Sequence, residues 1–433
     1  MWPVTTTRNT SGELQVGGVS LVDLAAEFGT PVYVYDEQTL RQNARTFREA
    51  LAAVYPRSRV AYAAKAFLTT AVVQILCEEG LGLDVVSGGE LAVGLRAGMP
   101  PREIALHGNN KSGAELRQAA DAGVGMVIVD NEQDIDLLAV LALNCSEPIK
   151  VMLRINPGVD VHTHRKISTG LADSKFGLPV IGGQAEAAVA RLAGTPGLDL
   201  VGYHAHVGSQ LFDCEATVSS VDALIAFAAS MRECYGVECR HLSPGGGFGI
   251  AYRDGDRPPS PQNWTNVLAD AVRAACDRHA LPLPMLTIEP GRAIVGPAGV
   301  ALYSVGSVKE LPGIRTYVAV DGGMADNLRP SLYEAEYSAE IANRKAAGDE
   351  REVAIAGKYC ESGDILIERI VLPPVTSGDL LAIPAAGAYC LSMASNYNMA
   401  LKPPVVLVND GAARLIRRRE TFDDLVRCDI PLR

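Results

Sequence analysis

The sequence predicts an α/β fold in which a (β/α)8 barrel of the TIM type is followed by a mainly antiparallel β domain. Eight short, almost wholly apolar segments recur between residues 60 and 288, and helical patterns separate them. Continuous apolar segments of this kind are typical of parallel strands that are buried on both faces. Beyond about residue 297, Gly and Pro turns separate the apolar segments, with little helix between them, which favours an antiparallel arrangement.

The eight predicted barrel strands are residues 60–64, 81–86, 103–106, 126–129, 149–153, 200–203, 239–242 and 285–288. Segment 239–242 is poorly apolar on its own, and its place in the alternation is what predicts a strand there. Eight strand–helix alternations fit a closed barrel better than a doubly wound open sheet.

Two helix starts can be predicted from capping residues. Asp36 is a good N-cap, and after it apolar residues recur at spacings of four and three from Leu40 to Val54, which gives one apolar stripe. The run Ser87-Gly88-Gly89-Glu90 has the pattern of a capping box that opens another helix.

The β domain is predicted from strands at residues 300–305, 316–320, 364–367 and 405–408. The first 36 residues contribute little to a barrel, so we expect them to join this domain. The predicted division is therefore a barrel over residues 37–297, with residues 1–36 and 298–433 forming the β domain.

Composition and charge exclude several classes of protein. The 39 basic and 50 acidic residues give a net charge of −11, and scattered arginines argue against a nucleic-acid or anionic-membrane surface. No apolar run approaches the roughly 20 residues that span a bilayer, and the opening residues lack a signal-peptide pattern. Nine cysteines without a CxxC motif are typical of reduced thiols, which predicts a cytoplasmic protein.

In barrels of this type the chemistry lies at the C-terminal ends of the strands. The residues at these ends are Lys65, Asp84 with Ser87, His107 with Asn109, Arg154 with Asn156, His204 with His206, Gly245-Gly246-Gly247 and Glu289-Pro290-Gly291-Arg292. Lys65 ends an apolar strand, where desolvation would lower the pKa of its ammonium and make the amine a nucleophile for imine formation. A lysine that extends to the solvent is the alternative.

Two further motifs allow more than one interpretation. Gly245-Gly246-Gly247-Phe248-Gly249 could offer backbone N–H groups to an anion, but it lacks the dinucleotide pattern GxGxxG. His204-Ala205-His206 and His162-Thr163-His164 suggest a metal site, but too few other ligands end the strands, and we expect no metal.

Two other features could be purely structural. Glu289 and Arg292 could form a salt-bridged turn. Cys360 could be a small core hydrophobe, as most single cysteines are.

Taken together, the motifs resemble the pyridoxal-phosphate decarboxylases with an alanine-racemase-like barrel, and among them the diaminopimelate decarboxylases. The matching stretches follow the family's order from residue 62 to 389, so the resemblance covers nearly the whole chain. They are Tyr62-Ala63-Ala64-Lys65-Ala66, His107-Gly108-Asn109-Asn110-Lys111, His206-Val207-Gly208-Ser209-Gln210, Gly245-Gly246-Gly247, Glu289-Pro290-Gly291-Arg292, Asp326-Asn327-Leu328-Arg329-Pro330-Ser331-Leu332-Tyr333, Cys360-Glu361-Ser362-Gly363-Asp364 and Gly387-Ala388-Tyr389. Leu328 stands where the family usually has proline.

The resemblance implies a cofactor and the residues that hold it. Lys65 would bind pyridoxal 5′-phosphate as an imine, Glu289 would keep the pyridine nitrogen protonated, and His206 would stack on the ring. The phosphate and the rest of the cofactor would be held by Asp84, Ser209, Gly246, Gly247, Gly291, Arg292 and Tyr389. Cys360 would protonate the carbanion, and in the family this cysteine comes from the partner subunit, which implies a homodimer with shared active sites.

Diaminopimelate carries a second amino-acid group at its far end. Arg292, Arg329 and Tyr333 would bind the distal carboxylate, and Glu361 the distal ammonium. Tyr389 would be a further substrate-binding residue. Diamine-forming substrates such as ornithine lack a distal carboxylate, so the arginines favour diaminopimelate and a product of L-lysine and carbon dioxide. A related decarboxylase, for example of carboxynorspermidine, an amino-acid racemase and a non-catalytic cofactor carrier are the alternatives.

Overall fold

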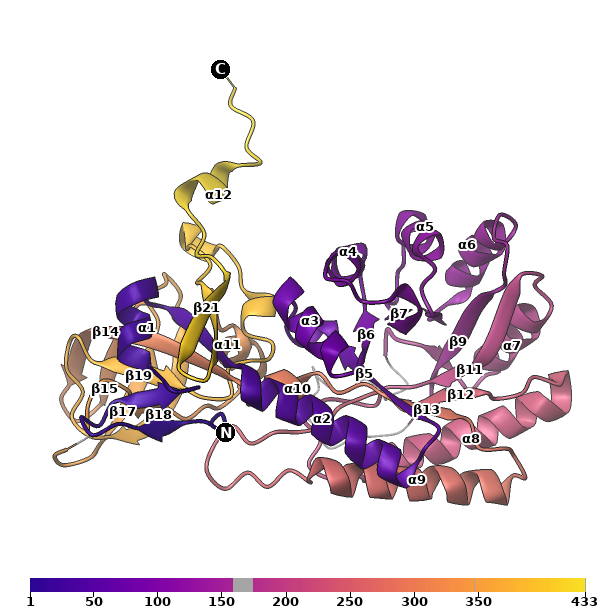
Figure 1. Cartoon of the computed structure of the whole chain (residues 1–433), viewed down its shortest axis with the longest axis horizontal. Coiled ribbons are helices and arrows are strands. Elements are labelled where there is room, and N and C mark those ends of the chain that lie inside the picture. The colour runs from indigo at the N-terminus through magenta and orange to yellow at the C-terminus, as the bar shows by residue number, and fades with distance from the viewer. Residues whose placement is uncertain (159–173, 346, 433) are drawn as a thin grey trace. The chain divides into compact units, whose positions relative to one another are not determined.

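The computed structural model describes residues 1–158, 174–345 and 347–432, which divide into two compact units (Figure 1). The first, here called the barrel unit, consists of residues 44–249 and 258–291. The second, called the β unit, consists of residues 1–43, 250–257 and 292–433. Each unit is described by itself below.

The barrel unit contains eight parallel strands that close into a ring. Each strand pairs with the next along the chain, and the last pairs with the first. The strands are β5 (Ser58–Ala63), β6 (Gly82–Val85), β7 (Ile104–Leu106), β8 (Met126–Val129), β9 (Ile149–Asn156), β11 (Leu198–His204), β12 (His241–Ser243) and β13 (Met285–Ile288). The predicted barrel is confirmed, including a strand at the poorly apolar segment near residue 241. A short strand, β10 (Leu178–Pro179), extends beyond the ring from β9.

A helix follows each barrel strand, as the alternation predicts. These helices are α3 (Thr70–Glu78), α4 (Gly88–Arg96), α5 (Gly113–Ala122), α6 (Glu132–Ala142), α7 (Gln184–Ala193), α8 (Glu215–Tyr235), α9 (Pro261–Arg278) and α10 (Arg292–Val295). The chain enters the barrel through α2 (Glu37–Val54), and short 3-10 turns, η1 (Ala64–Ala66) and η2 (Pro101–Glu103), lie beside β5 and β7.

The two predicted helix caps are present, one of them with a difference. The Thr39 N–H donates to Asp36 Oδ2 at 3.1 Å, and the apolar stripe of α2 from Leu40 to Leu51 is buried. The Glu90 N–H donates to Ser87 Oγ at 3.2 Å, which is the expected cap of α4. The other half of the predicted capping box is wrong, because the Glu90 carboxylate accepts from the Val86 N–H, one residue before Ser87.

The β unit contains a nine-stranded sheet and a three-stranded sheet. In the larger sheet β15 pairs with β17, and β4 with β20, in parallel, while the other described pairs are antiparallel. The larger sheet comprises β4 (Val32–Asp36), β14 (Gly299–Leu311), β15 (Arg315–Val320), β16 (Glu340–Ile341), β17 (Arg351–Ala356), β18 (Ile365–Leu372), β19 (Leu380–Ile383), β20 (Val405–Asn409) and β21 (Ala412–Arg417). The smaller one comprises β1 (Thr7–Arg8), β2 (Leu14–Val16) and β3 (Val19–Ser20).

The N-terminal segment belongs to the β unit, as predicted. Strand β4 lies between β14 and β20, and helix α1 (Leu21–Phe28) packs its buried Leu21 and Leu24 into a core shared with these strands. The β unit also holds α11 (Arg329–Tyr333), α12 (Phe422–Val426), η3 (Leu391–Met393) and η4 (Tyr397–Met399). The predicted boundaries at residues 36 and 297 remain a prediction.

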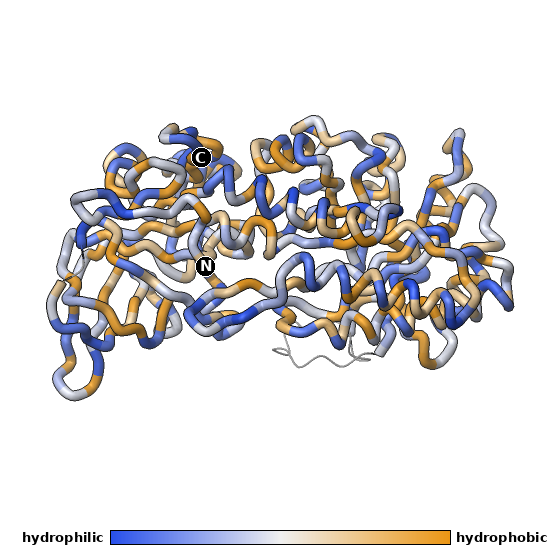
Figure 2. Tube along the Cα trace, turned by 60° about the horizontal axis from the view of Figure 1, so that its bottom comes forward, coloured by the Kyte–Doolittle hydropathy of each residue, from blue (hydrophilic) through white to orange (hydrophobic). Residues whose placement is uncertain are grey.

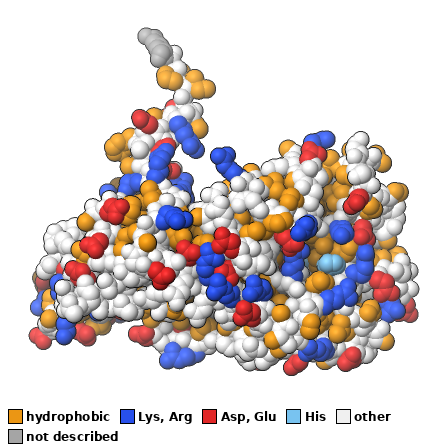
Figure 3. Space-filling model, in the orientation of Figure 1, with side chains coloured by type: hydrophobic (Ala, Val, Ile, Leu, Met, Phe, Trp, Pro, Cys, Tyr) orange, Lys and Arg blue, Asp and Glu red, His pale blue; other side chains and the backbone are white. Residues whose placement is uncertain are grey.

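Hydrophobic and hydrophilic stretches alternate along the whole trace (Figure 2). Acidic and basic side chains are interspersed over the face drawn in Figure 3. Within the described residues, no helix is long and apolar enough to cross a membrane.

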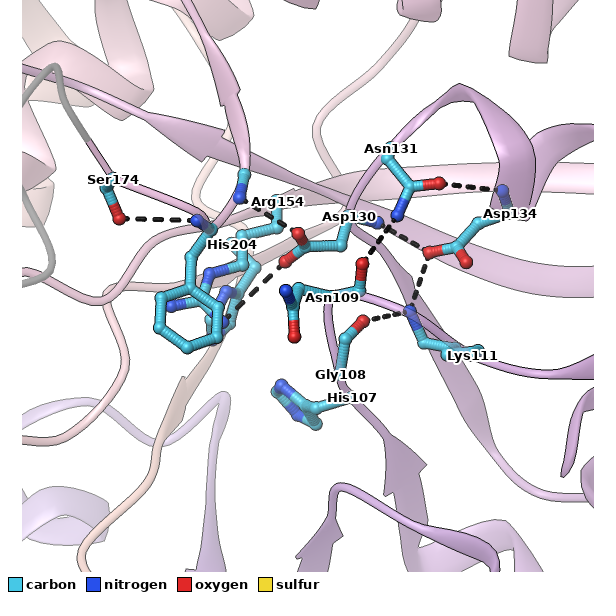
Figure 4. Close-up of polar contacts among 12 residues, drawn as sticks. His107, Gly108, Asn109, Lys111, Asp130, Asn131, Asp134, Arg154, Ser174 and His204 are labelled. Atoms are coloured by element: carbon cyan, nitrogen blue, oxygen red, sulfur yellow. Dashed lines mark hydrogen bonds and ion pairs between the residues drawn. The ribbon is translucent and has the colours of Figure 1, made fainter.

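A buried ion pair fastens the loop after β7 to helix α6 (Figure 4). Lys111 Nζ donates to Asp134 Oδ2 and to the Gly108 carbonyl, each at 2.7 Å, and both side chains are buried. The same carboxylate oxygen accepts from the Asp130 N–H at 2.9 Å. This pair holds the loop that carries His107 and Asn109.

We expect Lys111→Met to lower the thermal unfolding temperature, because it leaves the Asp134 carboxylate buried without its cation. Loss of one partner of a buried pair typically costs about 3–5 kcal/mol. The double variant Lys111→Met, Asp134→Leu should recover part of the loss, since no charge is then left buried. Calorimetric melting of the three proteins tests this, and equal melting temperatures for wild type and Lys111→Met would contradict it.

Candidate functional site

The mouth of the barrel gathers polar side chains from six strand ends. Closure of the ring brings them together although they are far apart in the sequence. They are Lys65 after β5, Asp84 on β6, His107 after β7, His204 on β11, Ser243 on β12 and Glu289 after β13. His107 and His204 appear in Figure 4 and pack edge to face, with ring centroids 5.0 Å apart.

Glu289 is the centre of this cluster. Its Oε2 lies 3.0 Å from His204 Nε2, and its Oε1 accepts from Ser243 Oγ at 2.6 Å. Burial alone would raise the pKa of this carboxyl group, but the two imidazoles of His204 and His107 and the Ser243 hydroxyl outweigh burial. The pKa of Glu289 therefore lies well below its ordinary value, and the group is ionised.

Burial shifts the pKa values of Asp84 and His107 in opposite directions. Burial, followed by the negative charge of Glu289, raises the pKa of Asp84 well above its ordinary value. Burial lowers the pKa of His107 well below its ordinary value, and its Nε2 lies 3.4 Å from Asp84 Oδ1. The pKa values of the two acids are thus shifted apart, that of Glu289 downward and that of Asp84 upward.

The two histidines of the HxH motif have different partners. His204 contacts Glu289, whereas His206 Nδ1 accepts from the Gly246 N–H at 3.2 Å. Burial lowers the pKa of His206 well below its ordinary value, and the charges of Lys65 and Arg154 act in the same direction. His206 is therefore a neutral ring. The other motif, His162-Thr163-His164, lies outside the described residues.

One group at the mouth has the geometry of a metal site. Ligand atoms of His107, His204 and Glu289 lie within 4.8 Å of one another. This trio differs from the HxH pair because His206 is not part of it. Glu289 already has two hydrogen-bond partners here, so the arrangement also satisfies the carboxylate without a metal.

The glycine loop after β12 can be built only from glycine. A Cβ on Gly246 would lie 2.1 Å from the Glu289 carbonyl oxygen, and a Cβ on Gly247, whose φ is +100°, would lie 2.5 Å from the Gly208 carbonyl oxygen. The Gly247 carbonyl also accepts from the Leu211 N–H at 2.9 Å. The loop is thereby fastened to the segment that contains Ser209, at the edge of the mouth where an anion was predicted.

Lys65 lies in η1, directly after β5, and its side chain is exposed. The desolvation expected of it is therefore wrong for this structure. Its amine is accessible to a ligand, which is the property that attachment of a carbonyl compound requires.

The β unit contributes a second cluster, made of two arginines and three tyrosines. Arg292 Nη1 donates to Tyr252 Oη at 2.6 Å, and its guanidinium lies 4.7 Å from the centroid of the Tyr389 ring. The guanidinium of Arg329 lies 4.5 Å from the centroid of the Tyr252 ring and donates to Tyr337 Oη. Both arginines are buried.

The remaining predicted site residues of the β unit lie near its surface. Cys360 and Glu361 are exposed, and Tyr333 is half-buried. The Cys360 N–H donates to Asn398 Oδ1 at 2.9 Å, and its carbonyl accepts from Tyr397 Oη at 3.2 Å. Cys360 is therefore held by its backbone with its side chain exposed, and it is not a core hydrophobe.

Sequence reasoning missed three residues of these clusters. Ser243 stands two positions before the first glycine of the loop, and Tyr252 three positions after the last. A hydroxyl next to a glycine loop is a weak signal in itself. No sequence pattern pointed to Tyr337, because it lies outside the motif that contains its partner Arg329.

The fold and the barrel mouth define the class of pyridoxal-dependent decarboxylases. The family model for the pyridoxal-binding domain of these enzymes matches residues 37–296. More particularly, the chain belongs to the family of the diaminopimelate decarboxylases, on the strength of the following relatives.

The chain is 46% identical over 429 residues to the diaminopimelate decarboxylase of Bacillus subtilis, which covers 99% of this chain and 98% of the relative. It is 43% identical over 439 residues to the enzyme of that name from Mycobacterium tuberculosis, with the same coverage. The crystal structure of diaminopimelate decarboxylase from M. jannaschii in complex with L-lysine superposes with a TM-score of 0.92 at 35% identity. That match covers 100% of this chain and 99% of the other.

The residues at the mouth fit pyridoxal phosphate. An ionised, buried carboxylate suits a protonated ring nitrogen, a neutral imidazole can lie against a ring, and an exposed amine can bond to a carbonyl carbon. The glycine loop has no room for side chains, which leaves its backbone open to an oxyanion.

The division of charge at the mouth can be tested by infrared spectroscopy on cofactor-free protein. We expect a protonated carboxyl band near neutral pH that disappears in Asp84→Asn, because burial and the Glu289 charge raise the pKa of Asp84. In Glu289→Gln the band should disappear at a lower pH than in wild type, since the charge that helps to raise the Asp84 pKa is gone. A band that survives in Asp84→Asn would show that another group holds the proton.

Proposed function

We propose that this chain decarboxylates meso-2,6-diaminopimelate to L-lysine and carbon dioxide, the last step of lysine biosynthesis, with pyridoxal 5′-phosphate as cofactor. The near full-length identity to enzymes of that name carries the proposal. The ionised Glu289 at the barrel mouth supports it, because it is the group that the chemistry requires.

When bound, pyridoxal phosphate supplies an electron sink for the pair left behind as carbon dioxide departs. Lys65 Nζ would hold the cofactor covalently through its carbonyl carbon. Glu289 would hold a proton at the pyridine nitrogen, with its carboxylate oriented by His204 and Ser243. His206 would lie against the ring, and Asp84 would be a further cofactor-binding residue.

The phosphate is bound mainly by backbone N–H groups. We assign it to Ser209, Gly246, Gly247, Gly291, Arg292 and Tyr389. Tyr389 has a φ of +60°, an unusual conformation for a residue with a side chain, and it is held next to Gly387, where a Cβ would lie 1.9 Å from the Val295 carbonyl oxygen. Such a conformation persists only where its surroundings enforce it.

The remaining site residues are assigned to the second amino-acid group of the substrate. Arg292, Arg329 and Tyr333 bind the distal carboxylate, Glu361 accepts from the distal ammonium, and Tyr389 is a further substrate-binding residue. Both arginines are buried among aromatic rings, an environment that favours a carboxylate partner. Cys360 Sγ delivers the proton that replaces the carboxylate.

The protein acts as a homodimer in which each site takes its Cys360 from the second subunit. The exposure of Cys360 and Glu361 supports this, because residues that serve another subunit must lie at the surface of their own. A cytoplasmic location is part of the proposal and is supported by nine cysteines that are all free thiols.

The decisive experiment is release of carbon dioxide from meso-diaminopimelate by purified protein with pyridoxal phosphate. We expect stoichiometric L-lysine, and loss of activity by at least about 10³-fold in Lys65→Ala, since covalent attachment is then impossible. Ornithine and L-lysine serve as comparison substrates. Turnover of either in preference to diaminopimelate would contradict the proposal.

Reduction by borohydride provides a control for the role of Lys65. It should fix the cofactor to Lys65, as peptide mass spectrometry would show. Attachment at another lysine would assign the site elsewhere.

Subunit exchange tests the shared site. Lys65→Ala and Cys360→Ala proteins should each be nearly inactive. Once mixed, half of the dimers are hybrids, each with one intact site, so activity should return to about a quarter of wild type. Failure to recover despite demonstrated exchange would place both residues of each site in one chain.

A further inference from the structure

The two buried arginines of the β unit are held by tyrosines that the proposed mechanism does not use. Tyr252 and Tyr337 pack edge to face, with centroids 5.2 Å apart. Tyr252 accepts a hydrogen bond from Arg292 with its hydroxyl and lies against Arg329 with its ring. Tyr337 accepts from Arg329 with its hydroxyl and lies 5.4 Å from the same guanidinium with its ring.

Burial of cations near one another is costly unless anions balance them. Among the described residues, no carboxylate lies within ion-pair distance of Arg329, and its Nε has no hydrogen-bond partner there. The groups that raise the Arg329 pKa against the effect of burial are Tyr252, Tyr337 and Cys390, none of them a carboxylic acid. In the part of the chain that the structure describes, this cation is therefore held by one hydroxyl, that of Tyr337, and by the ring faces of Tyr252 and Tyr337.

Neutral partners orient a cation without neutralising its charge. A carboxylate would neutralise the guanidinium and compete with an incoming anion. A phenol hydroxyl fixes the direction of an N–H group, and a ring face fixes the plane, while the full positive charge remains available. Burial raises the pKa of Tyr337 well above its ordinary value, so this phenol does not become an anion.

We propose that Tyr252 and Tyr337 are positioning residues that hold Arg292 and Arg329 for the distal carboxylate of the substrate and thereby determine specificity for amino acids that carry it. The inference rests on the proposed function and extends it to two residues that have no contact role there. Tyr252 is the shared member, because it contacts both arginines.

The location of Tyr252 gives this role a structural basis. The segment 250–257 directly follows the glycine loop of the barrel but belongs to the β unit. Within the segment, the Asp256 carboxylate accepts from the Tyr252 N–H at 2.9 Å. Tyr252 is thus held by its backbone, while its side chain organises the two cations.

The experiment measures equilibrium binding of two ligands to the holoenzyme. L-Lysine retains the carboxylate that is distal in diaminopimelate, and cadaverine has the same two amines without any carboxylate. We expect wild type to bind L-lysine more tightly. The measured ratio is the dissociation constant of cadaverine divided by that of L-lysine. In Tyr252→Phe and Tyr337→Phe this ratio should fall about tenfold, on the scale of one charged hydrogen bond, because L-lysine binds more weakly while cadaverine binding is unchanged.

Two further variants separate positioning from general destabilisation. Tyr252→Leu removes the ring as well and should lower the ratio further, because Arg329 loses its stacking partner. Tyr33→Phe is the matched control: its hydroxyl is also buried in the β unit and hydrogen-bonded, but to Tyr303 and Asp326, and its ratio should equal wild type.

Unchanged ratios in both Tyr252→Phe and Tyr337→Phe would overturn the inference, as would equal weakening of both ligands, which indicates a structural defect. The proposed function is tested separately, by carbon dioxide release from diaminopimelate with the wild-type protein, and neither of these results bears on that measurement. A lower ratio in Tyr252→Leu than in Tyr252→Phe would support the contribution of ring stacking, because the two variants differ in the aromatic ring.

Discussion

The site depends on one pairing, that of β13 with β5, which closes the ring. Ile288 lies opposite Val60, and the Ala63 N–H donates to the Pro290 carbonyl at 3.3 Å. These bonds place the strand that ends at Glu289 beside the strand that ends at Lys65, although almost the whole barrel sequence separates the two. Parallel strands in a ring end at one mouth, so every other functional side chain of the barrel follows from this closure.

Closure also determines the electrostatics. The mouth holds two carboxyl groups and three imidazoles in a buried space, and a low dielectric does not allow them all to be charged. Contacts with His204 and Ser243 favour the negative charge on Glu289, while burial, followed by that charge, raises the pKa of Asp84. Asp and Glu side chains ordinarily have similar pKa values, so the difference between Asp84 and Glu289 comes from their neighbours.

The sequence was sufficient for the strands and strand ends, because apolar runs of barrel strands have a strong local signal. It was insufficient where a partner is remote. Strand β17 has exposed charges at its start, and the parallel pairing of β4 with β20 joins the two ends of the chain. Likewise, the exposure of Lys65 and the contact of Tyr252 with Arg329 depend on tertiary packing, which no local pattern records.

The two units are interleaved in the chain, which crosses between them after residues 43, 249, 257 and 291. The short segment between the second and third crossings, residues 250–257, contains Tyr252. Neither unit is therefore a continuous stretch of sequence, and no single cut releases either one whole. Recombination that exchanges one contiguous gene segment could not swap the barrel while keeping the β unit. Exchange of residues 44–291 as one segment would carry residues 250–257 along with the barrel, and with them Tyr252 of the arginine cluster.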